Sequence, residues 1–311
     1  LGHVHAQGHA IWGVAHLGLV TGEGRYLDWA RHALDFILET QATDYGWVPE
    51  WVAEKREGRA FNTGRSEVCA VSDMVSIAAC LAQAGYSEYW DWIERCVRNY
   101  LREMQFAVTP AYEEEYRRLH GEKAEEGLRV MRELEGGFVG ATWPNSWLDR
   151  EDHMDMMGCC SPEGMRALYT AWSNTVTESR EGVFVNLSLN RDAPGAKVVS
   201  FLPERARVTV VAKRDADFFL RPPAWAVSRR SSDQGETSVK AYRQGHEVPV
   251  EWRRDYVALR QARAGEELTI TYPLLAWRQR VLVPCADYDV QWKDDAHLTY
   301  RRKSEQEGQE Y

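Results

Sequence analysis

A repeated pattern in the first half of the chain limits the folds that this sequence can form. The stretch 22–30 (Gly-Glu-Gly-Arg-Tyr-Leu-Asp-Trp-Ala) returns 63 residues later as 85–93 (Gly-Tyr-Ser-Glu-Tyr-Trp-Asp-Trp-Ile). Each copy continues with apolar residues at helical spacing, and each follows another helical stretch, 10–20 or 71–84. A glycine marks the helix end inside each pair. The sequence therefore predicts helical hairpins that stack into part of an (α/α)6 barrel, an α/α toroid, with the chemistry in its loops.

The period of the apolar residues changes to two from about Glu181. Short alternating or apolar stretches, with Pro and Gly between them, are found at 183–187, 207–211, 217–221, 257–259 and 267–271. They predict an antiparallel β-sandwich, so the fold class is α+β multidomain. We expect three parts: 1–178 as the C-terminal part of a toroidal catalytic domain, 179–276 as the β-sandwich domain, and 277–311 as a C-terminal extension with a frayed polar end. Within the first part, Tyr112 to Glu135 is expected to form one charged, solvated helix.

Composition excludes several classes of function. The net charge of -9 and the pI near 5.6 argue against a nucleic-acid partner, and no apolar run is long enough to predict a membrane span. Six cysteines among 311 residues are too few for a disulfide framework, so we expect a reducing compartment and a cytoplasmic location. The chain opens on Leu1, which predicts a fragment or a processed product. The pattern does not indicate an oligomeric state.

Four possible metal ligands occur in two short stretches about ninety positions apart: Glu67 and Cys69, then Cys159 and Cys160. Consecutive Cα atoms lie about 3.8 Å apart and a relaxed disulfide needs roughly 4.4 Å, so the adjacent thiols are better placed to face one centre than to bridge each other. Glu67 and Cys69 converge in an extended or turn-like segment just before a helix. A Cys3Glu set suits tetrahedral Zn²⁺. The alternative is that these cysteines are small buried hydrophobic residues, because the usual CxxC signature is absent.

These residues resemble the pattern of glycoside hydrolase family 127, the zinc-dependent β-L-arabinofuranosidases, in which Glu-x-Cys precedes a helix and Cys-Cys follows later. The stretch 3–7 (His-Val-His-Ala-Gln) is similar to the family's His-x-Asn-Thr-Gln segment, with His5 and Ala6 in place of Asn and Thr. The stretch 221–226 (Arg-Pro-Pro-Ala-Trp-Ala) is similar to its Arg-Ile-Pro-x-Trp strand end. The resemblance covers nearly the whole chain and implies a divergent, N-terminally truncated member, since a full member has several more helices before His3.

The resemblance implies a retaining glycosidase that acts on β-L-arabinofuranosides or related sugars. Cys159 would be the nucleophile, and Glu67, Cys69 and Cys160 would complete a zinc site that keeps its thiol deprotonated. Closed coordination of this kind also suits a structural metal. The alternative function is therefore a noncatalytic, zinc-stapled carbohydrate-binding protein derived from that fold.

The loop before the metal ligands departs from the family pattern. Family members carry Gly-Glu-x-Phe and Leu-Pro-Asn there, whereas this chain has 46–51 (Gly-Trp-Val-Pro-Glu-Trp). The family places its general acid/base sixteen residues before the metal-binding glutamate, and that position holds Trp51. A shift of one residue makes Glu50 the candidate, with Glu54 second, whereas the ordinary interpretation of Glu50 is a solvated loop carboxylate.

Other candidates are weaker. The resemblance implies that His3 contacts substrate. The tryptophans expected in loops, where they could stack on sugars, are Trp47, Trp51, Trp143 and Trp147. Because the chain has thirteen tryptophans, core packing is the default expectation for any one of them. A hydrogen-bonded role on a helix surface or in the core, rather than metal ligation, is expected for His5, His9 and His16. His153 and Asp155 could offer an alternative N/O metal set, but we expect them to hydrogen-bond to the metal ligands or to have no role at the site. The cysteines expected in the core are Cys80, Cys96 and Cys285.

Overall fold

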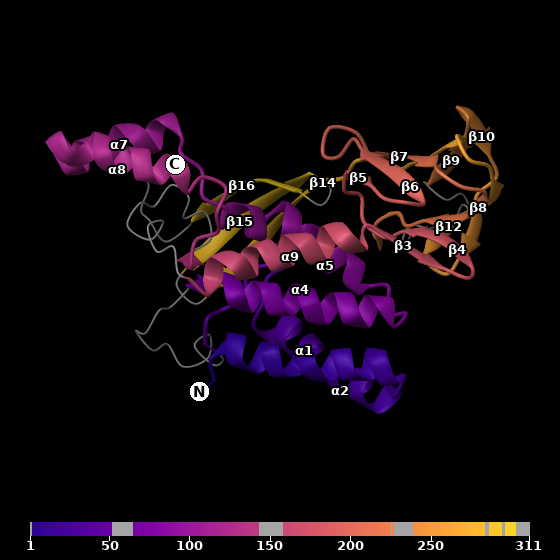
Figure 1. Ribbon diagram of the computed structural model, residues 1–311, viewed down its shortest axis with the longest axis horizontal. Helices are drawn as coiled ribbons and strands as arrows, with labels where there is room; N and C mark the ends of the chain where they lie inside the picture. The colour runs from indigo at the N-terminus through magenta and orange to yellow at the C-terminus, as the bar shows by residue number, and fades with distance from the viewer. Residues whose placement is uncertain are drawn as a thin grey trace.

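The computed structural model describes residues 2–51, 65–142, 158–224, 226, 239–283, 286–293 and 296–302 (Figure 1). A helical half is followed by two packed β-sheets and by a third, three-stranded sheet. This arrangement confirms the predicted α+β class. Within the described residues, none of the helices has the length and apolarity needed to cross a bilayer.

The sequence repeat forms two helical hairpins. Their helices are α1 (Val4–Thr21), α2 (Gly24–Thr40), α4 (Val68–Gln83) and α5 (Tyr89–Arg98). Gly22 ends α1 in the left-handed region at φ 73°, and its N–H donates to the Gly18 carbonyl at 2.9 Å. The helix α4, which is rich in Ala, Val and Ser, is buried along almost its whole length between α1 and α9 (Cys160–Asn174). The hairpins are confirmed, and their closure into a toroid stays a prediction.

The charged segment is a helical hairpin rather than the single helix that the sequence predicted. After α6 (Tyr100–Glu103), the chain forms α7 (Pro110–His120), a 3₁₀ turn at Gly121–Lys123 and α8 (Ala124–Glu133). Gly121 has φ 54°, a conformation that glycine adopts without strain, and it reverses the chain there. Figure 1 shows this hairpin projecting away from the rest of the molecule.

The second half contains two sheets that share one core. The strands are β3 (Val176–Ser179), β4 (Gly182–Val185), β5 (Arg191–Asp192), β6 (Ala196–Ser200), β7 (Arg207–Ala212), β8 (Ala216–Leu220), β9 (Lys240–Arg243), β10 (His246–Val248), β11 (Glu251–Arg253), β12 (Tyr256–Ala262) and β13 (Glu267–Thr271). One sheet has the order β10-β9-β13-β7-β6-β5 and the other β11-β12-β8-β4-β3. Buried side chains of both form one apolar cluster, including Val210 from the first and Phe218 from the second. Antiparallel pairing was predicted throughout, but β4 and β8 pair in parallel, because the chain crosses to the other sheet between them.

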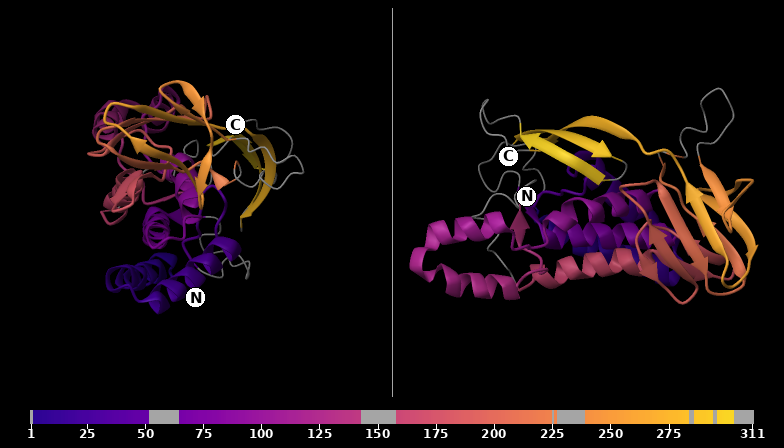
Figure 2. Two further views of the ribbon diagram at one scale, coloured as in Figure 1. Left: turned by 90° about the vertical axis from the view of Figure 1, so that its right-hand side faces the viewer. Right: turned by 90° about the horizontal axis from the view of Figure 1, so that it is seen from above.

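The third sheet packs on the helices. It consists of β14 (Ala276–Val283), β15 (Ala286–Lys293) and β16 (Ala296–Arg302). Trp292 is buried in the same apolar cluster as the helical core and stacks on Trp277 with ring centroids 5.5 Å apart. Gln279 Nε2 donates to Asp44 Oδ2 at 2.6 Å. Figure 2 shows this sheet lying against the helices rather than extending the other two sheets.

Candidate metal centre

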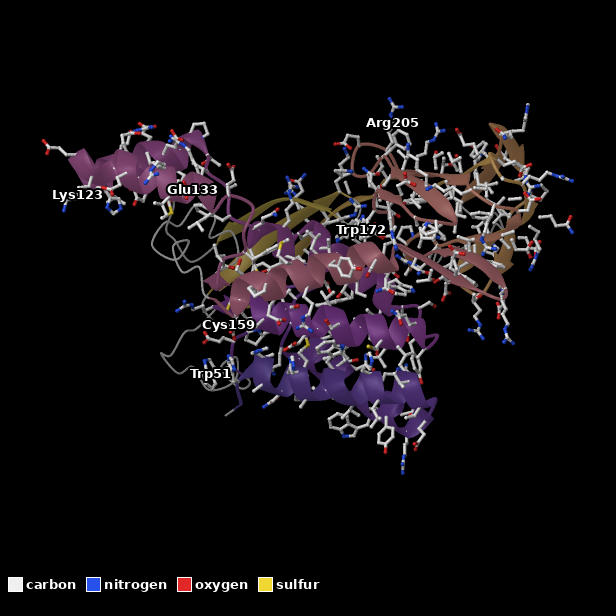
Figure 3. All side chains as sticks on the ribbon, in the orientation of Figure 1. Trp51, Lys123, Glu133, Cys159, Trp172 and Arg205 are labelled. Carbon is white, nitrogen blue, oxygen red and sulfur yellow. The ribbon has the colours of Figure 1, made fainter. Side chains whose placement is uncertain are left out.

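Three helices begin at one end of the helical half. The first residues of α1, α4 and α9 follow His3, Glu67 and Cys159 respectively. Cys159 and Trp51 both lie at this end (Figure 3). The positive ends of three helix dipoles therefore lie near one another, which stabilises negative charge at this point.

A short β pair positions the first two candidate ligands. Strand β1 (Ser66–Glu67) pairs with β2 (Ala141–Thr142), and the Val68 N–H donates to the Gly140 carbonyl at 3.1 Å. Glu67 has extended backbone angles, φ -98° and ψ 132°, and Cys69 is the second residue of α4. The side chains of Glu67 and Cys69 thus reach one point from an extended residue and the first helical turn, the local geometry that their i, i+2 spacing predicts.

Glu67, Cys69, Cys159 and Cys160 converge, with one possible ligand atom from each lying within 4.8 Å of the others. Cys160 is central: its Sγ lies 3.4 Å from Cys69 Sγ, 3.5 Å from Cys159 Sγ and 3.5 Å from Glu67 Oε1. Cys69 and Cys160 are buried, and Cys159 is exposed. Burial alone would fit small core residues, but core packing does not explain an exposed thiol and a carboxylate beside two buried thiols.

The contacts among the three thiols shift their pKa values in different directions. A hydrogen bond from the Cys69 thiol to Cys160 raises the pKa of Cys69, and the same bond lowers the pKa of Cys160. The pKa of Cys159 is raised, chiefly by its hydrogen bond with Cys160. Of the three thiols, Cys160 is therefore the one whose surroundings favour the thiolate form. A bound cation would favour the thiolate form of Cys159 as well.

The donor set fits Zn²⁺. Tetrahedral zinc with Zn–S bonds of about 2.3 Å puts its sulfur ligands about 3.8 Å apart, close to the separations of Cys160 from Cys69 and Cys159. Glu67 Oε2 is buried and no donor among the described residues is aligned for a hydrogen bond to it, although His3 Nε2 lies 2.6 Å away. Zinc would be held by Glu67, Cys69, Cys159 and Cys160.

Glu50 and Trp51 lie beside the start of α1. The Glu50 carbonyl accepts from Val4 N–H at 2.8 Å, and Trp51 forms a bridge with His3, their ring centroids 4.9 Å apart. Trp51 is exposed and Glu50 is half-buried. The fold therefore brings both residues to the end of the helices that carries the cysteine cluster. The roles predicted for Glu50 and Trp51 remain predictions. So does the substrate contact predicted for His3, whose Nε2 lies 2.6 Å from Glu67 Oε2.

Trp47 does not form a sugar-stacking wall, contrary to the prediction. It is fully buried in the helical core. The backbone N–H of Trp47 donates to Thr43 Oγ1 at 3.1 Å, and the Trp47 carbonyl accepts from the Thr43 backbone N–H. These two bonds close a tight turn. Gly46, at φ 97° and packed against Cys96, completes that turn and directs the indole inward.

Other predicted residues fall into two groups. Cys80 and Cys96 are buried in the core as expected, and His16 is exposed on α1. The candidates that lie outside the described residues are Glu54, Trp143, Trp147, His153, Asp155 and Cys285.

Sequence reasoning missed two charged residues beside the cluster. Asp73 is fully buried on α4, and Arg166 on α9 donates from Nη2 to Asp73 Oδ1 at 2.8 Å. Asp73 stands four residues after Cys69, so it lies on the same helix face one turn further along. The sequence signal that could have identified Asp73 is an acidic residue four positions after Cys69 in an otherwise apolar helix.

Comparison with known proteins gives no match to a protein-family model and no match to a curated protein. Among solved structures, the chain is similar to a glycoside hydrolase family 127 (GH127) β-L-arabinofuranosidase from Geobacillus stearothermophilus T6, with a TM-score of 0.61 and 14% identity. It is also similar to a second GH127 β-arabinofuranosidase (TM-score 0.63, 14% identity) and to a further glycoside hydrolase (0.65, 14%).

Each of these comparisons covers 95% of this chain and 46%, 47% or 51% of the other. The chain thus spans about half the length of the solved structures that it matches. At 14% identity, the feature that this chain shares with these structures is its architecture. The chain therefore has a GH127-like fold.

Proposed function

We propose that this chain is part of a retaining glycoside hydrolase that acts on β-L-arabinofuranosides or related sugars through Cys159. The observation that carries the proposal is the convergence of three cysteines and Glu67, with Cys159 as the exposed thiol. The fold supports it, since two of the similar structures are named as arabinofuranosidases. Residues 1–178 would form part of the catalytic toroid, 179–276 a sandwich and 277–311 an extension.

In the proposed reaction, Cys159 Sγ attacks the anomeric carbon while Glu50 gives its proton to the departing glycosidic oxygen. A sugar–cysteine thioether forms. Glu50, now ionised, then takes a proton from a water molecule that attacks the same carbon, and Cys159 leaves as a thiolate. A bound Zn²⁺ would supply the charge that keeps Cys159 deprotonated in both steps. Two displacements retain the configuration at the anomeric carbon.

Hydrolysis of a panel of 4-nitrophenyl glycosides tests the proposal. We expect the largest kcat/KM on an L-arabinofuranoside, and proton NMR of the first product should show the configuration of the substrate. Inverted product, or a preference for pyranosides alone, would contradict it. If the protein holds zinc and binds sugars without hydrolysing any glycoside, the noncatalytic carbohydrate-binding function replaces it. The closed set of four protein ligands favours that second candidate.

Metal analysis gives a first prediction. Protein purified under reducing conditions should hold about one zinc per chain, and Cys160→Ser should lose most of it. Cys160 is buried and lies within 3.5 Å of Cys69, Cys159 and Glu67, so its loss removes the ligand that the others surround. Cys80→Ser, the same change elsewhere on buried α4, is the control and should keep the metal. Wild-type protein without any bound metal would rule out the site.

Glu50→Gln gives a second prediction. The variant should still form the intermediate from an activated nitrophenyl glycoside, because that leaving group needs no proton, but it should lose most activity on natural glycosides. Azide should restore the second step, since it attacks without a general base. The control is Glu133→Gln, an exposed change on the projecting hairpin (Figure 3). Full activity of Glu50→Gln on a natural disaccharide would move the role to Glu54 or elsewhere.

A further inference from the structure

A second polar cluster lies beside the cysteine cluster, where α1, α4 and α9 pack together. Its centre is Asp73, whose side chain is fully buried. His5 Nδ1 lies 2.7 Å from Asp73 Oδ2, and His9 Nδ1 lies 3.3 Å from Asp73 Oδ1. Gly8 allows this approach, because a Cβ there would come within 2.8 Å of Asp73 Cβ.

The two histidines and Asp73 have the spacing of a metal site, but their charge does not favour a second cation. The guanidinium of Arg166 donates to Asp73 at 2.8 Å, and Glu163 and the ring of Trp12 hold it in that position. A divalent ion at Asp73 would lie close to this guanidinium and be repelled by it. The cluster is therefore a hydrogen-bonded network in which an ionised carboxylate accepts from every partner.

This network fixes the tautomer of both imidazoles. An ionised carboxylate can only accept hydrogen bonds, so His5 and His9 donate from Nδ1, and a neutral ring that carries its proton there has an unprotonated Nε2. Within the described part of the chain, neither Nε2 has a hydrogen-bonding partner. The His5 side chain is 27% exposed and that of His9 55% exposed. Two oriented acceptors are thus open to a ligand.

These acceptors are continuous with the proposed active site. The rings of Trp51, His3, His5 and His9 follow one another with centroids 4.9, 5.8 and 5.6 Å apart. His3 Nε2 contacts Glu67, one of the four residues of the cysteine cluster. A row of rings thus leads from the cluster along the first two turns of α1.

We propose that His5 and His9 bind hydroxyl groups of the carbohydrate whose anomeric carbon lies at Cys159, and that Asp73 is the residue that positions them. The proposal rests on the proposed function. Sugar hydroxyls are donors that would complete the two Nε2 acceptors, and carbohydrates carry several on neighbouring carbons. The two histidines would then contribute to sugar specificity, since a sugar that lacks one of these hydroxyls would leave an acceptor unpaired.

The substitution His→Asn separates the two ring nitrogens. An Asn amide replaces Nδ1 as donor to Asp73 and nothing replaces Nε2. For His5→Asn and His9→Asn we expect KM for a nitrophenyl L-arabinofuranoside to rise about three- to tenfold each, as for a lost hydrogen bond, with little change in kcat. Binding of L-arabinose, measured by calorimetry, should weaken by the same factor. His16→Asn, an exposed change on the same helix, is the control and should match wild type.

Imidazole ¹⁵N NMR tests the positioning role of Asp73 independently of activity. We expect the Nδ1–H tautomer for His5 and His9 in wild type. In Asp73→Asn it should be lost at the histidine that faces the amide NH₂, most simply His5, because Arg166 and His9 share the other oxygen. The Nε2–H tautomer in wild type would overturn the inference, as would His5→Asn and His9→Asn variants that bind sugar like His16→Asn. A loss of bound metal in His5→Asn would also overturn it, because it would show that His5 binds a cation. If the protein binds L-arabinose through these histidines but hydrolyses nothing, the inference stands and the proposed activity fails. A wild-type protein that binds no sugar overturns both.

Discussion

Cys159→Ser should lower turnover of every glycoside substrate by about 10³-fold or more while the protein keeps most of its metal. A serine hydroxyl is far less acidic than a thiol, so it is a poorer nucleophile at neutral pH. The metal should stay because Cys69 and Cys160, both buried, and Glu67 still supply three donors. Steady-state kinetics and metal analysis on the same preparation measure the two quantities separately.

The comparison with Cys160→Ser makes this result specific. Both substitutions remove one thiol from the same cluster, but Cys160 is buried and lies within 3.5 Å of all three other residues, whereas Cys159 is exposed. We therefore expect Cys159→Ser to lose turnover and keep its metal, and Cys160→Ser to lose both turnover and metal. Cys80→Ser on α4 should change neither. Near-wild-type turnover of Cys159→Ser would move the nucleophile to another residue and leave the cysteine cluster a structural role.

The local part of the candidate site could be predicted from the sequence because spacing fixes local geometry. Glu67 and Cys69 are two residues apart and Cys159 and Cys160 are adjacent, so each pair has few possible arrangements. That the two pairs meet is a property of the packing of α4 against α9, which no spacing determines. The resemblance to a known family supplied that step, and the structure brings the four side chains together.

The network around Asp73 could not be predicted in the same way. His5 and His9 stand four residues apart on one helix face, but the carboxylate that orients them comes from α4 and its counter-charge, Arg166, from α9. Helix packing and a glycine at position 8 decide those contacts, because a side chain there would hold the helices apart.

Two corrections have the same cause, a glycine whose backbone conformation reverses the chain. Trp47 lies in a loop, as the sequence predicted, but the turn at Gly46 places its indole in the core instead of on a sugar-binding surface. The charged residues from 112 to 135 have a helical period throughout, and Gly121 at φ 54° divides them into α7 and α8. Periodicity records which face of an element is apolar, but not where one glycine ends that element.

A buried ionic network joins the helical half to the β-sheets and gives the last prediction. Arg221, at the end of β8, donates from Nη1 to Asp91 Oδ1 at 2.6 Å and from Nη2 to Glu94 Oε2 at 3.4 Å, both on α5. It also donates from Nε to the Asn186 carbonyl at 2.6 Å. Burial lowers the pKa of the Arg221 guanidinium, but the charges of Asp91 and Glu94 more than offset this and raise its pKa above the ordinary value.

Arg221→Met should lower the free energy of unfolding by about 3–5 kcal/mol, because it leaves the buried Asp91 without its cation and leaves Glu94 paired with Arg98 alone. Urea unfolding followed by far-UV circular dichroism measures the change. Arg207→Met is the matched control: Arg207 pairs with Glu267 at 3.5 Å on the surface of the same pair of sheets, so its loss should cost less than about 1 kcal/mol. Adding Asp91→Asn to Arg221→Met should recover part of the loss, since it removes the carboxylate that Arg221 neutralised, whereas Glu94 still pairs with Arg98. Equal costs at 207 and 221 would mean that the buried network stabilises the protein no more than a surface ion pair does. The packing between helices and sheets, rather than this network, would then hold the two halves together.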